Sequence, residues 1–427
     1  IDEEHEGSYK QDKSPRYHAR EVAARLARAR GAALVLGSAT PSLESLERCR
    51  AGSYRGAAWT RVEMPERPGR AVLPRVTVVD MAEQFRGGAR SIFSAPLANA
   101  LLDVIKRREK AVLLLNRRGF ANFLMCRECG CVPECPHCST ALTYHERGHM
   151  LVCHSCGRSW PVRAFPDPST ACPNCGSRYL AAFGVGTQRV EDELRMLLPA
   201  DVEVIRMDAD TTRTKGAHQQ LLEQFDAAER AVLVGTQMIA KGLDFPEVTL
   251  VGVINADTML KLPDFRAAER TYDLLEQVAG RAGRGERPGE VIVQTYWATH
   301  PAMRAVATHD RSVFLEAELA ERAEAGYPPF RRLANVTVWG RGEKSVRSTC
   351  ADLAAAVRER VGDAPGWEVL GPADCVKARV KDQVRRHVMV KAPVDADLGG
   401  LLGACVASLG RRVGSNIAVD IDAYDLM

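Results

Sequence analysis

Four regularly spaced pairs of cysteines stand out between residues 126 and 175. Eight of the 13 cysteines form these Cys-x-x-Cys pairs: Cys126/Cys129, Cys135/Cys138, Cys153/Cys156 and Cys172/Cys175. A thiolate pair with this spacing can bend around one metal ion, and two pairs supply the four sulfur ligands that structural zinc prefers. Because nothing else in the chain is typical of a secreted protein, the pattern predicts two structural zinc sites rather than a disulfide framework.

The spacing leaves open which cysteine pairs share a metal. In a nested arrangement, Cys126/Cys129 and Cys172/Cys175 would bind one zinc ion, and the two inner pairs would bind the other. In a sequential arrangement, each pair would share a metal with its neighbour along the chain. Cys131 lies between two pairs without an obvious partner, and we expect it to be a bystander.

A second group of chemically suggestive residues opens the chain. Asp2-Glu3-Glu4-His5 has the residue types of a nucleotide-hydrolysis site. The first carboxylate can hold Mg²⁺ through its water shell, and the second can polarise the water that attacks a γ-phosphate. Gly37-Ser38-Ala39-Thr40-Pro41 follows a predicted strand, and its small hydroxyl residues can link a phosphate site to a bound nucleic-acid strand. Together the two segments resemble motifs II and III of the superfamily-two helicases.

Two further motifs follow in the order that such helicases require. Gly235-Thr236-Gln237 ends a predicted strand, and the run 239–246 contains Gly242 and Asp244. Small and hydroxyl residues let the backbone approach a phosphate chain, and Asp244 can contact a ribose or a neighbouring motif. The segment from Gln277 to Arg284 places Arg281 and Arg284 three residues apart on one helical face. Guanidinium groups delivered in this way can stabilise the charge of a transferring phosphoryl group, as motif VI does.

An alternation of helices and strands is predicted to position these motifs. We predict strands at 32–36, 111–115, 202–207, 231–235, 249–254 and 290–295, and helices at 20–30, 96–108, 187–198, 217–225 and 267–279. Strands that are apolar on both faces, such as 111–115, are typical of a parallel sheet. The cysteine segment interrupts this rhythm, and 333–427 differs from it, with strands at 334–339, 387–391 and 417–421 and helices at 345–361 and 398–409.

The predicted fold class is therefore α/β: RecA-like helicase lobes with parallel sheets, a two-zinc Cys-rich insertion and a small α+β carboxy-terminal domain. The expected boundaries are 1–75 for the end of a first lobe and a linker, 76–125 with 176–325 for a second lobe, 126–175 for the insertion, and 326–427 for the last domain. The 427 residues, 46% of them hydrophobic, suffice for several packed cores and exclude a disordered protein.

The net charge, the hydrophobic pattern and the first residues of the sequence indicate what kind of protein this is. A net charge of +4 is only mildly basic, so any affinity for nucleic acid must come from local patches. The chain has no apolar run of transmembrane length and no signal peptide, and we expect a cytoplasmic protein without a membrane partner. It lacks an initiator Met and opens on a catalytic motif, so we expect it to be the carboxy-terminal part of a longer polypeptide.

The motifs in this order resemble the PriA family of replication restart helicases, also called the primosomal protein N′ family. Beyond the motifs above, the resemblance rests on Tyr9-Lys10-Gln11, Arg16-Tyr17-His18-Ala19-Arg20 and Asn116-Arg117-Arg118-Gly119-Phe120. It implies a 3′→5′ DNA helicase that recognises abandoned forks and recruits other primosome proteins and the single-stranded DNA-binding protein. It also implies nested zinc pairing.

The resemblance implies roles for individual residues. The implied catalytic residues are Asp2, Glu3, Gln277, Arg281 and Arg284. His5, Gly242 and Asp244 are added as contacts to ATP and its Mg²⁺, and the implied DNA contacts are Arg16, Tyr17, His18, Arg20, Thr40 and Thr236. Four histidines near the cysteines could replace a thiolate, but with eight thiolates available we expect them to be solvated or to face DNA: His137, His145, His149 and His154.

Two departures from the family qualify these expectations. The family's amino-terminal DNA-binding domains and its Gly-Lys-Thr phosphate loop are absent from the sequence, so this chain alone should be a poor ATPase. In addition, Pro15 precedes Arg16-Tyr17, where the family often carries a tryptophan, so base stacking would rest on Tyr17, with Tyr9 nearby.

A local basic run near the end of the chain has two interpretations. Its members are Lys377, Arg379, Lys381, Arg385, Arg386 and Lys391. The run is either a solvated face or a contact surface, and we expect Lys377 and Arg385 to contact a DNA backbone or the acidic tail of the single-stranded DNA-binding protein. A protein of another class also fits the motifs: a DNA-binding primosome scaffold that does not hydrolyse ATP.

Overall fold

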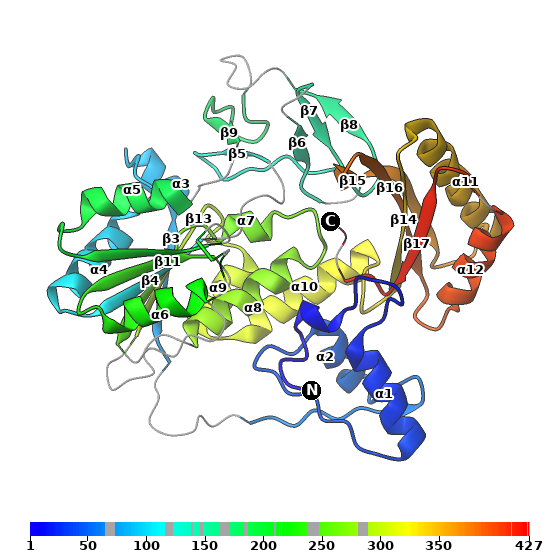
Figure 1. Cartoon of the computed structure of the whole chain (residues 1–427), viewed down its shortest axis with the longest axis horizontal. Coiled ribbons are helices and arrows are strands. Elements are labelled where there is room, and N and C mark those ends of the chain that lie inside the picture. Colours follow the sequence, from blue (N-terminus) through cyan, green and yellow to red (C-terminus); the bar gives the residue numbers. More distant parts are fainter. Residues whose placement is uncertain are drawn as a thin grey trace.

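The computed structural model places four structural units around one another (Figure 1). It describes residues 1–64, 73–115, 123–137, 140–145, 148–162, 171–182, 187–208, 211–212, 214, 216–236, 247–280, 289–410, 412–424 and 426. None of the helices in this described part combines the length and the apolar character that a bilayer span requires.

Residues 1–64 form a small, mostly helical unit. It contains the 3₁₀ helix η1 (Gly7–Tyr9), the helices α1 (Ala19–Arg30) and α2 (Leu43–Arg50), and a short hairpin of β1 (Ser53–Tyr54) and β2 (Ala57–Ala58). Helix α1 begins at the cap His18, whose side chain accepts from the Arg20 amide, and ends at Gly31, whose φ of 62° gives the left-handed turn that glycine allows.

The strand predicted at 32–36 is wrong. These residues are described in full and have no strand assignment, and Val35 is 77% exposed. The adjoining residues pair with the start of the chain instead: the Gly37 amide donates to the Ile1 carbonyl at 2.8 Å, and the Glu4 amide donates to the Gly37 carbonyl at 3.1 Å. An apolar run becomes a buried strand only where further strands and helices cover it, and in the described residues none does so here.

The second unit is built on a six-stranded parallel sheet. Its strands are β3 (Arg75–Asp80), β4 (Lys110–Leu114), β10 (Glu203–Met207), β11 (Ala231–Gly235), β12 (Val248–Val253) and β13 (Glu290–Thr295). They lie in the order β10-β11-β4-β12-β13-β3, and every pairing is parallel. Strands β4, β11 and β12 are buried throughout, as the continuous apolar runs predict. Strand β3 follows a proline-rich segment, and the sequence pattern did not predict it.

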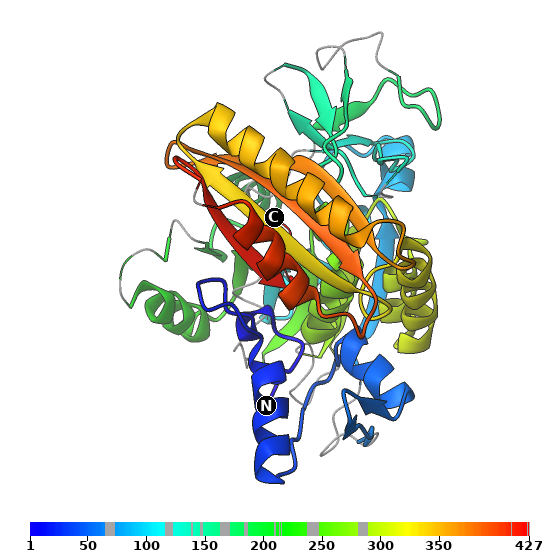
Figure 2. The same cartoon turned by 90° about the vertical axis from the view of Figure 1, so that its right-hand side faces the viewer.

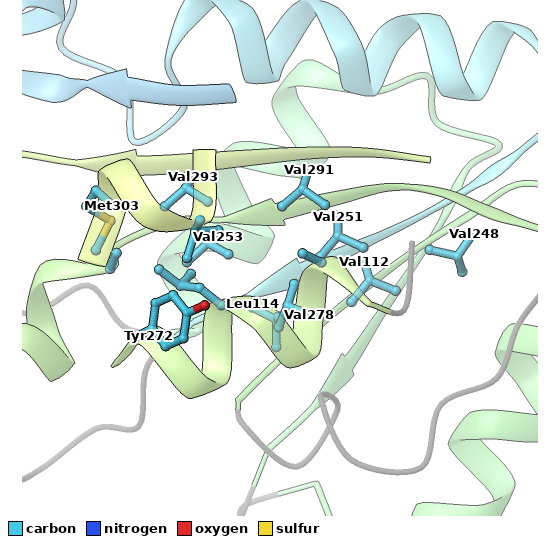
Figure 3. Packing of buried hydrophobic residues seen from close by; sticks show 14 of the residues in the cluster. Val112, Leu114, Val248, Val251, Val253, Tyr272, Val278, Val291, Val293 and Met303 are labelled. Atoms are coloured by element: carbon cyan, nitrogen blue, oxygen red, sulfur yellow. The ribbon is translucent and has the colours of Figure 1, made fainter. Parts of the chain in front are cut away.

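Helices cover both faces of this sheet. One face packs against α4 (Ala95–Lys106) and α5 (Thr187–Leu197), and α3 (Met81–Arg86) follows β3. The other face packs against α6 (Ala217–Ala227), α7 (Asp257–Leu260), α8 (Ala267–Ala279), α9 (Pro301–Thr308) and α10 (Arg311–Ala325). Figure 3 shows Tyr272 and Val278 of α8 beside Val112, Leu114, Val251 and Val253 of the sheet. This packing buries one face of α8 against the sheet.

The cysteine segment forms a separate small module. Strand β5 (Leu124–Cys126) pairs with β9 (Leu180–Ala182), and β6 (Thr143–His145), β7 (Met150–Val152) and β8 (Ser159–Pro161) form an antiparallel sheet. In Figure 1 this module lies above the parallel sheet and reaches the last unit on the right.

The last unit is an antiparallel sheet with two helices on one face (Figure 2). Strands β14 (Arg332–Gly340), β15 (Glu368–Val380), β16 (Gln383–Ala392) and β17 (Asn416–Ile421) lie in the order β15-β16-β14-β17. Helices α11 (Glu343–Val361) and α12 (Leu398–Ser408) supply most of its apolar core. The predicted α+β class is confirmed, and β15 is the strand that the pattern omits.

Candidate nucleotide and zinc sites

A chain of hydrogen bonds joins three of the predicted motifs. The buried His5 lies between Ser38 and Gln277: its Nδ1 is 2.7 Å from the Ser38 Oγ, and its Nε2 is 2.9 Å from the Gln277 Nε2. An amide nitrogen can only donate, so the Gln277 contact requires an unprotonated His5 Nε2 and leaves the ring proton on Nδ1, where it donates to Ser38. The first motif is therefore connected to α8 across the junction between two units.

The two carboxylates expected to handle Mg²⁺ and water remain accessible. Asp2 and Glu3 are exposed beside the buried Glu4 and His5. Glu3 has a φ of 46°, an uncommon conformation for a residue with a side chain, and the Asp2 Oδ1 accepts from the Glu3 amide at 2.9 Å. This loop presents its acidic side chains outward while the rest of the motif is held in the interior.

Glu4 anchors the acidic loop through a buried polar network. Its carboxylate pairs with Arg20, accepts from the Ser42 amide at 2.6 Å, and accepts from the Ser45 hydroxyl at 3.0 Å. Arg20 is 5% exposed and His18 is 8% exposed. This burial disfavours the direct DNA contacts expected for Arg20 and His18, and it gives Arg20 a part in holding the loop.

Helix α8 is tied to α2 by buried charges. Arg266 pairs with Glu44 at 2.5 Å, Glu269 accepts from the Leu43 amide at 2.9 Å, and Arg322 donates to Glu269 at 2.9 Å. Burial alone would raise the pKa of Glu44, but the guanidinium groups of Arg266, Arg322 and Arg20 outweigh it and hold the pKa below its usual range. These ion pairs fix the two units relative to each other.

Asp273 of α8 lies beside Thr40 of the predicted motif III, and the shift of its pKa is opposite to those of Glu44 and Glu269. Burial, together with the nearby Glu269 carboxylate, raises the pKa of Asp273 well above its usual value. Thr40 is 2% exposed in the same junction. Its burial disfavours the direct DNA contact expected for Thr40.

The remaining predicted residues fall into two groups. Gly242, Asp244, Arg281 and Arg284 lie outside the described residues, and their roles stay predictions. Tyr17 and Lys377 are exposed, while Arg16, Thr236 and Arg385 are half-buried. Thr236 directly follows β11 at the carboxyl edge of the parallel sheet, where ligands of such sheets commonly bind.

The cysteine sulfur atoms gather as nested pairing predicts. Cys126 lies 3.7 Å from Cys175, and Cys129 lies 3.6 Å from Cys172, in one cluster of four sulfur atoms. Cys135, Cys153 and Cys156 form a second cluster, in which Cys135 and Cys156 are 3.8 Å apart. Cys138 lies outside the described residues. In a tetrahedral zinc site with zinc–sulfur bonds of about 2.3 Å, the sulfur atoms are separated by about 3.8 Å. The two clusters therefore have the donor type and the spacing that zinc requires.

The cysteine module contacts the parallel-sheet unit at two points. The Trp297 Nε1 donates to the carbonyl of Gly130, which follows Cys129 of the outer cluster, at 2.8 Å, and Lys261 pairs with Glu134, which precedes Cys135 of the inner cluster, at 3.0 Å. A Cβ on Gly130 would lie 2.5 Å from the Tyr296 carbonyl oxygen, so this close approach requires glycine. The outer cluster is thus docked on the parallel-sheet unit.

The inner cluster is docked on the carboxy-terminal unit. The His154 Nδ1 lies 2.9 Å from the Asp374 carbonyl oxygen, and the His387 Nε2 lies 2.6 Å from the His154 carbonyl oxygen. His154 is 4% exposed, so the expectation that it is solvated or faces DNA is wrong. Its imidazole joins two units of the chain instead.

Several residues of the junction were absent from the sequence predictions. Asp273, Glu269 and Tyr424 lie in or beside it. The apolar and polar residues of α8 alternate with helical period, which predicts one buried face but does not show which unit covers that face. For Glu269 and Asp273 the only signal is their position on this helix, and for Tyr424, which follows β17, the pattern gives no signal.

Comparison with known proteins identifies the family. Over its whole length the chain is 46% identical to the replication restart protein PriA of Bacillus subtilis (strain 168), of which it covers 52%. It is 43% identical to the PriA protein of Synechocystis sp. over 92% of the chain and 47% of that protein. The chain belongs to the PriA family. It spans about half the length of these PriA relatives.

Models of three regions agree with this membership. The PriA DNA helicase Cys-rich region matches residues 135–161, the helicase conserved C-terminal domain matches 182–286, and the primosomal protein N C-terminal domain matches 323–424. The predicted fold class is confirmed, and the cysteine module of this chain is a zinc-binding region.

Proposed function

We propose that the full-length protein is an ATP-dependent 3′→5′ DNA helicase that recognises abandoned replication forks and directs primosome assembly. The hydrogen-bond chain Ser38–His5–Gln277 carries this proposal. It connects an acidic hydrolysis motif on one unit with the helix that leads to Arg281 on the next. A helicase motor needs such a connection, because ATP hydrolysis between two lobes must be coupled to their movement.

The accessible acidic loop supports the assignment of roles. ATP and Mg²⁺, when bound, supply the phosphoryl group and the charge that stabilises its transfer. We assign Asp2 to the Mg²⁺ side and Glu3 to orientation of the attacking water, because both side chains are exposed while Glu4 and His5 are held by buried partners. Arg281 and Arg284 would stabilise the developing negative charge.

A phosphate-loop motif is missing from this sequence. The 427 residues contain no Gly-Lys-Thr or Gly-Lys-Ser sequence. Without the backbone amides and lysine of that loop, ATP is not held in a productive position. We therefore propose that the isolated chain is a poor ATPase.

Two regions of the chain carry most of the DNA contacts that we propose. Tyr17 is 46% exposed, and we propose that it stacks on a base while the neighbouring Arg16 contacts the backbone. Lys377 and Arg385 lie on β15 and β16, whose connecting turn carries Lys381. We propose that this basic hairpin binds a DNA backbone or the acidic tail of the single-stranded DNA-binding protein. We also propose that two structural zinc ions, with nested pairing, hold the Cys-rich module against the parallel-sheet unit and the carboxy-terminal unit. A protein that acts on chromosomal forks would work in the bacterial cytoplasm.

The test is Glu3→Gln in the full-length protein. We expect this variant to bind ATP and Mg²⁺ but to lose DNA-stimulated turnover, because the amide cannot polarise the attacking water. Glu63→Gln, at an exposed position outside the junction, is the matched control and should keep the wild-type rate. Turnover by Glu3→Gln near the wild-type rate would reject the proposed role of Glu3. A wild-type protein that binds forks but hydrolyses no ATP would instead support the scaffold.

A further inference from the structure

The segment that follows β17 inserts into the junction between the acidic loop and α8. The Tyr424 hydroxyl donates to the His5 carbonyl at 2.6 Å. Its ring lies so close to the loop that a Cβ on Gly7 would be 2.8 Å from the Tyr424 Cε1, so the approach requires glycine at that position. A side chain 419 residues away from His5 thus contacts the backbone of the predicted hydrolysis motif.

The opposite side of Tyr424 is held by α8 and the residue before it. The Arg270 Nη2 donates to the Tyr424 carbonyl at 2.6 Å. The Arg266 and Arg270 guanidinium carbons lie 4.7 and 5.1 Å from the centre of the Tyr424 ring, which is within cation–π range. Tyr424 therefore touches both partners of the His5–Gln277 contact: the loop that carries His5 and the helix that carries Gln277.

Lys10 attaches the same segment at a second point. Its ammonium group pairs with Asp420 at 2.7 Å and donates to the carbonyls of Ile421 at 2.8 Å and Asp422 at 3.1 Å. The Lys10 side chain is 4% exposed, so this contact is shielded from water and salt. Because both attachments come from the end of β17, the position of the acidic loop depends on the carboxy-terminal unit.

From these contacts we propose that Tyr424 is a positioning residue for ATP hydrolysis. Its hydroxyl fixes the His5 backbone so that the imidazole meets Gln277, and the Lys10–Asp420 pair fixes the same loop from the other end. The carboxy-terminal unit thereby controls turnover without touching the nucleotide. The inference rests on the proposed helicase function.

The experiment compares Tyr424→Phe with the wild-type full-length protein in DNA-stimulated ATP hydrolysis. Phenylalanine keeps the ring between Gly7 and Arg266 and removes only the hydroxyl. We expect kcat to fall roughly 3- to 10-fold, as the loss of one hydrogen bond in the active arrangement allows. The KM for ATP, the affinity for forked DNA and the melting temperature should stay close to wild type. Tyr179→Phe removes a hydroxyl from a 53% exposed tyrosine in the cysteine module and serves as the control.

A second variant tests the other attachment. Lys10→Met should also lower kcat, and the double variant with Tyr424→Phe should lose less than the product of the two single effects, because both residues fix one loop. A wild-type kcat for Tyr424→Phe, in a preparation whose wild type hydrolyses ATP, would overturn this inference and leave the proposed function standing. A fall in melting temperature without a fall in kcat would also overturn it. Absence of hydrolysis in the wild type would overturn the proposed function itself.

Discussion

Nested zinc pairing predicts how many zinc ions the chain keeps when two of its cysteines are replaced. The structure puts Cys126 and Cys172 in one sulfur cluster although they lie 46 positions apart in the sequence, and it puts Cys153 in another. Because each zinc ion requires its four sulfur ligands, Cys126→Ser and Cys172→Ser should each lower the metal content from about two zinc ions per chain to about one. The double variant Cys126→Ser/Cys172→Ser should still hold about one, because both changes damage the same site.

The magnitude follows from the sulfur geometry. The separations of 3.6 and 3.7 Å in the outer cluster and 3.8 Å in the inner cluster match a tetrahedron built on bonds of about 2.3 Å. A serine hydroxyl is a poor substitute for a thiolate, so the damaged site should lose its metal to a mild chelator while the intact site keeps it. Metal analysis of protein purified without oxygen gives the count.

The matched control is Cys126→Ser/Cys153→Ser, which has the same number of substitutions but places them in different clusters. It should hold no zinc after the same treatment. The control damages both sites in either pairing, so it shows what the loss of both ions looks like. If Cys126→Ser/Cys172→Ser loses both ions as the control does, the reasoning from the sulfur positions is refuted and sequential pairing is supported. Cys131→Ser lies outside both clusters and should keep both ions.

Three further predictions concern Arg20, His18 and Arg284. Arg20→Met leaves the Glu4 carboxylate buried without its charged partner and should destabilise residues 1–64 by about 3–5 kcal/mol. Hydrogen exchange of the α1 amides measures this loss, and unchanged exchange would contradict the buried pair. Burial and the neighbouring Arg20 lower the pKa of His18 to about 3 in the folded protein. As the pH drops, the His18 imidazole therefore becomes protonated in the unfolded chain before it does in the folded protein. The free energy of unfolding should fall between about pH 6.5 and pH 3, by up to about 1.4 kcal/mol per pH unit. His18→Asn keeps a capping acceptor and should remove that part of the slope in acid titrations, whereas an unaltered slope would argue against a neutral His18. In the full-length protein, Arg284→Ala should lower turnover by roughly 10³-fold or more with little loss of ATP binding, and a parallel loss of both would indicate a structural role.

The sequence predicts most of the parallel sheet because its strands carry their own signal. Strands β4, β11 and β12 are continuous apolar runs, and the structure buries every residue of them. Residues 32–36 have the same local pattern and form no strand, because an apolar run forms a buried strand only where neighbouring elements cover it. Strand β3 was missed for the opposite reason: it is only half-buried over much of its length and follows prolines that are typical of a linker.

The same distinction separates the two candidate sites. Cys-x-x-Cys spacing is a local pattern, so the zinc ligands were predicted from the sequence and their sulfur atoms cluster accordingly. The contact between His5 and Gln277 joins residues 272 positions apart, and each was found only because it lies in a recognisable motif. Tyr424 lies in no such motif. Its role depends on the packing of the carboxy-terminal unit against the junction, which composition and periodicity do not encode.

Strand unwinding tests the central claim most directly. The full-length protein, incubated with a forked DNA duplex and ATP, should separate strands in an ATP-dependent reaction that requires a 3′ single-stranded tail on the strand along which it moves. Glu3→Gln should bind the same fork and leave it intact. Fork binding without ATP-dependent unwinding by the wild-type protein would contradict the motor assignment and support the scaffold in its place.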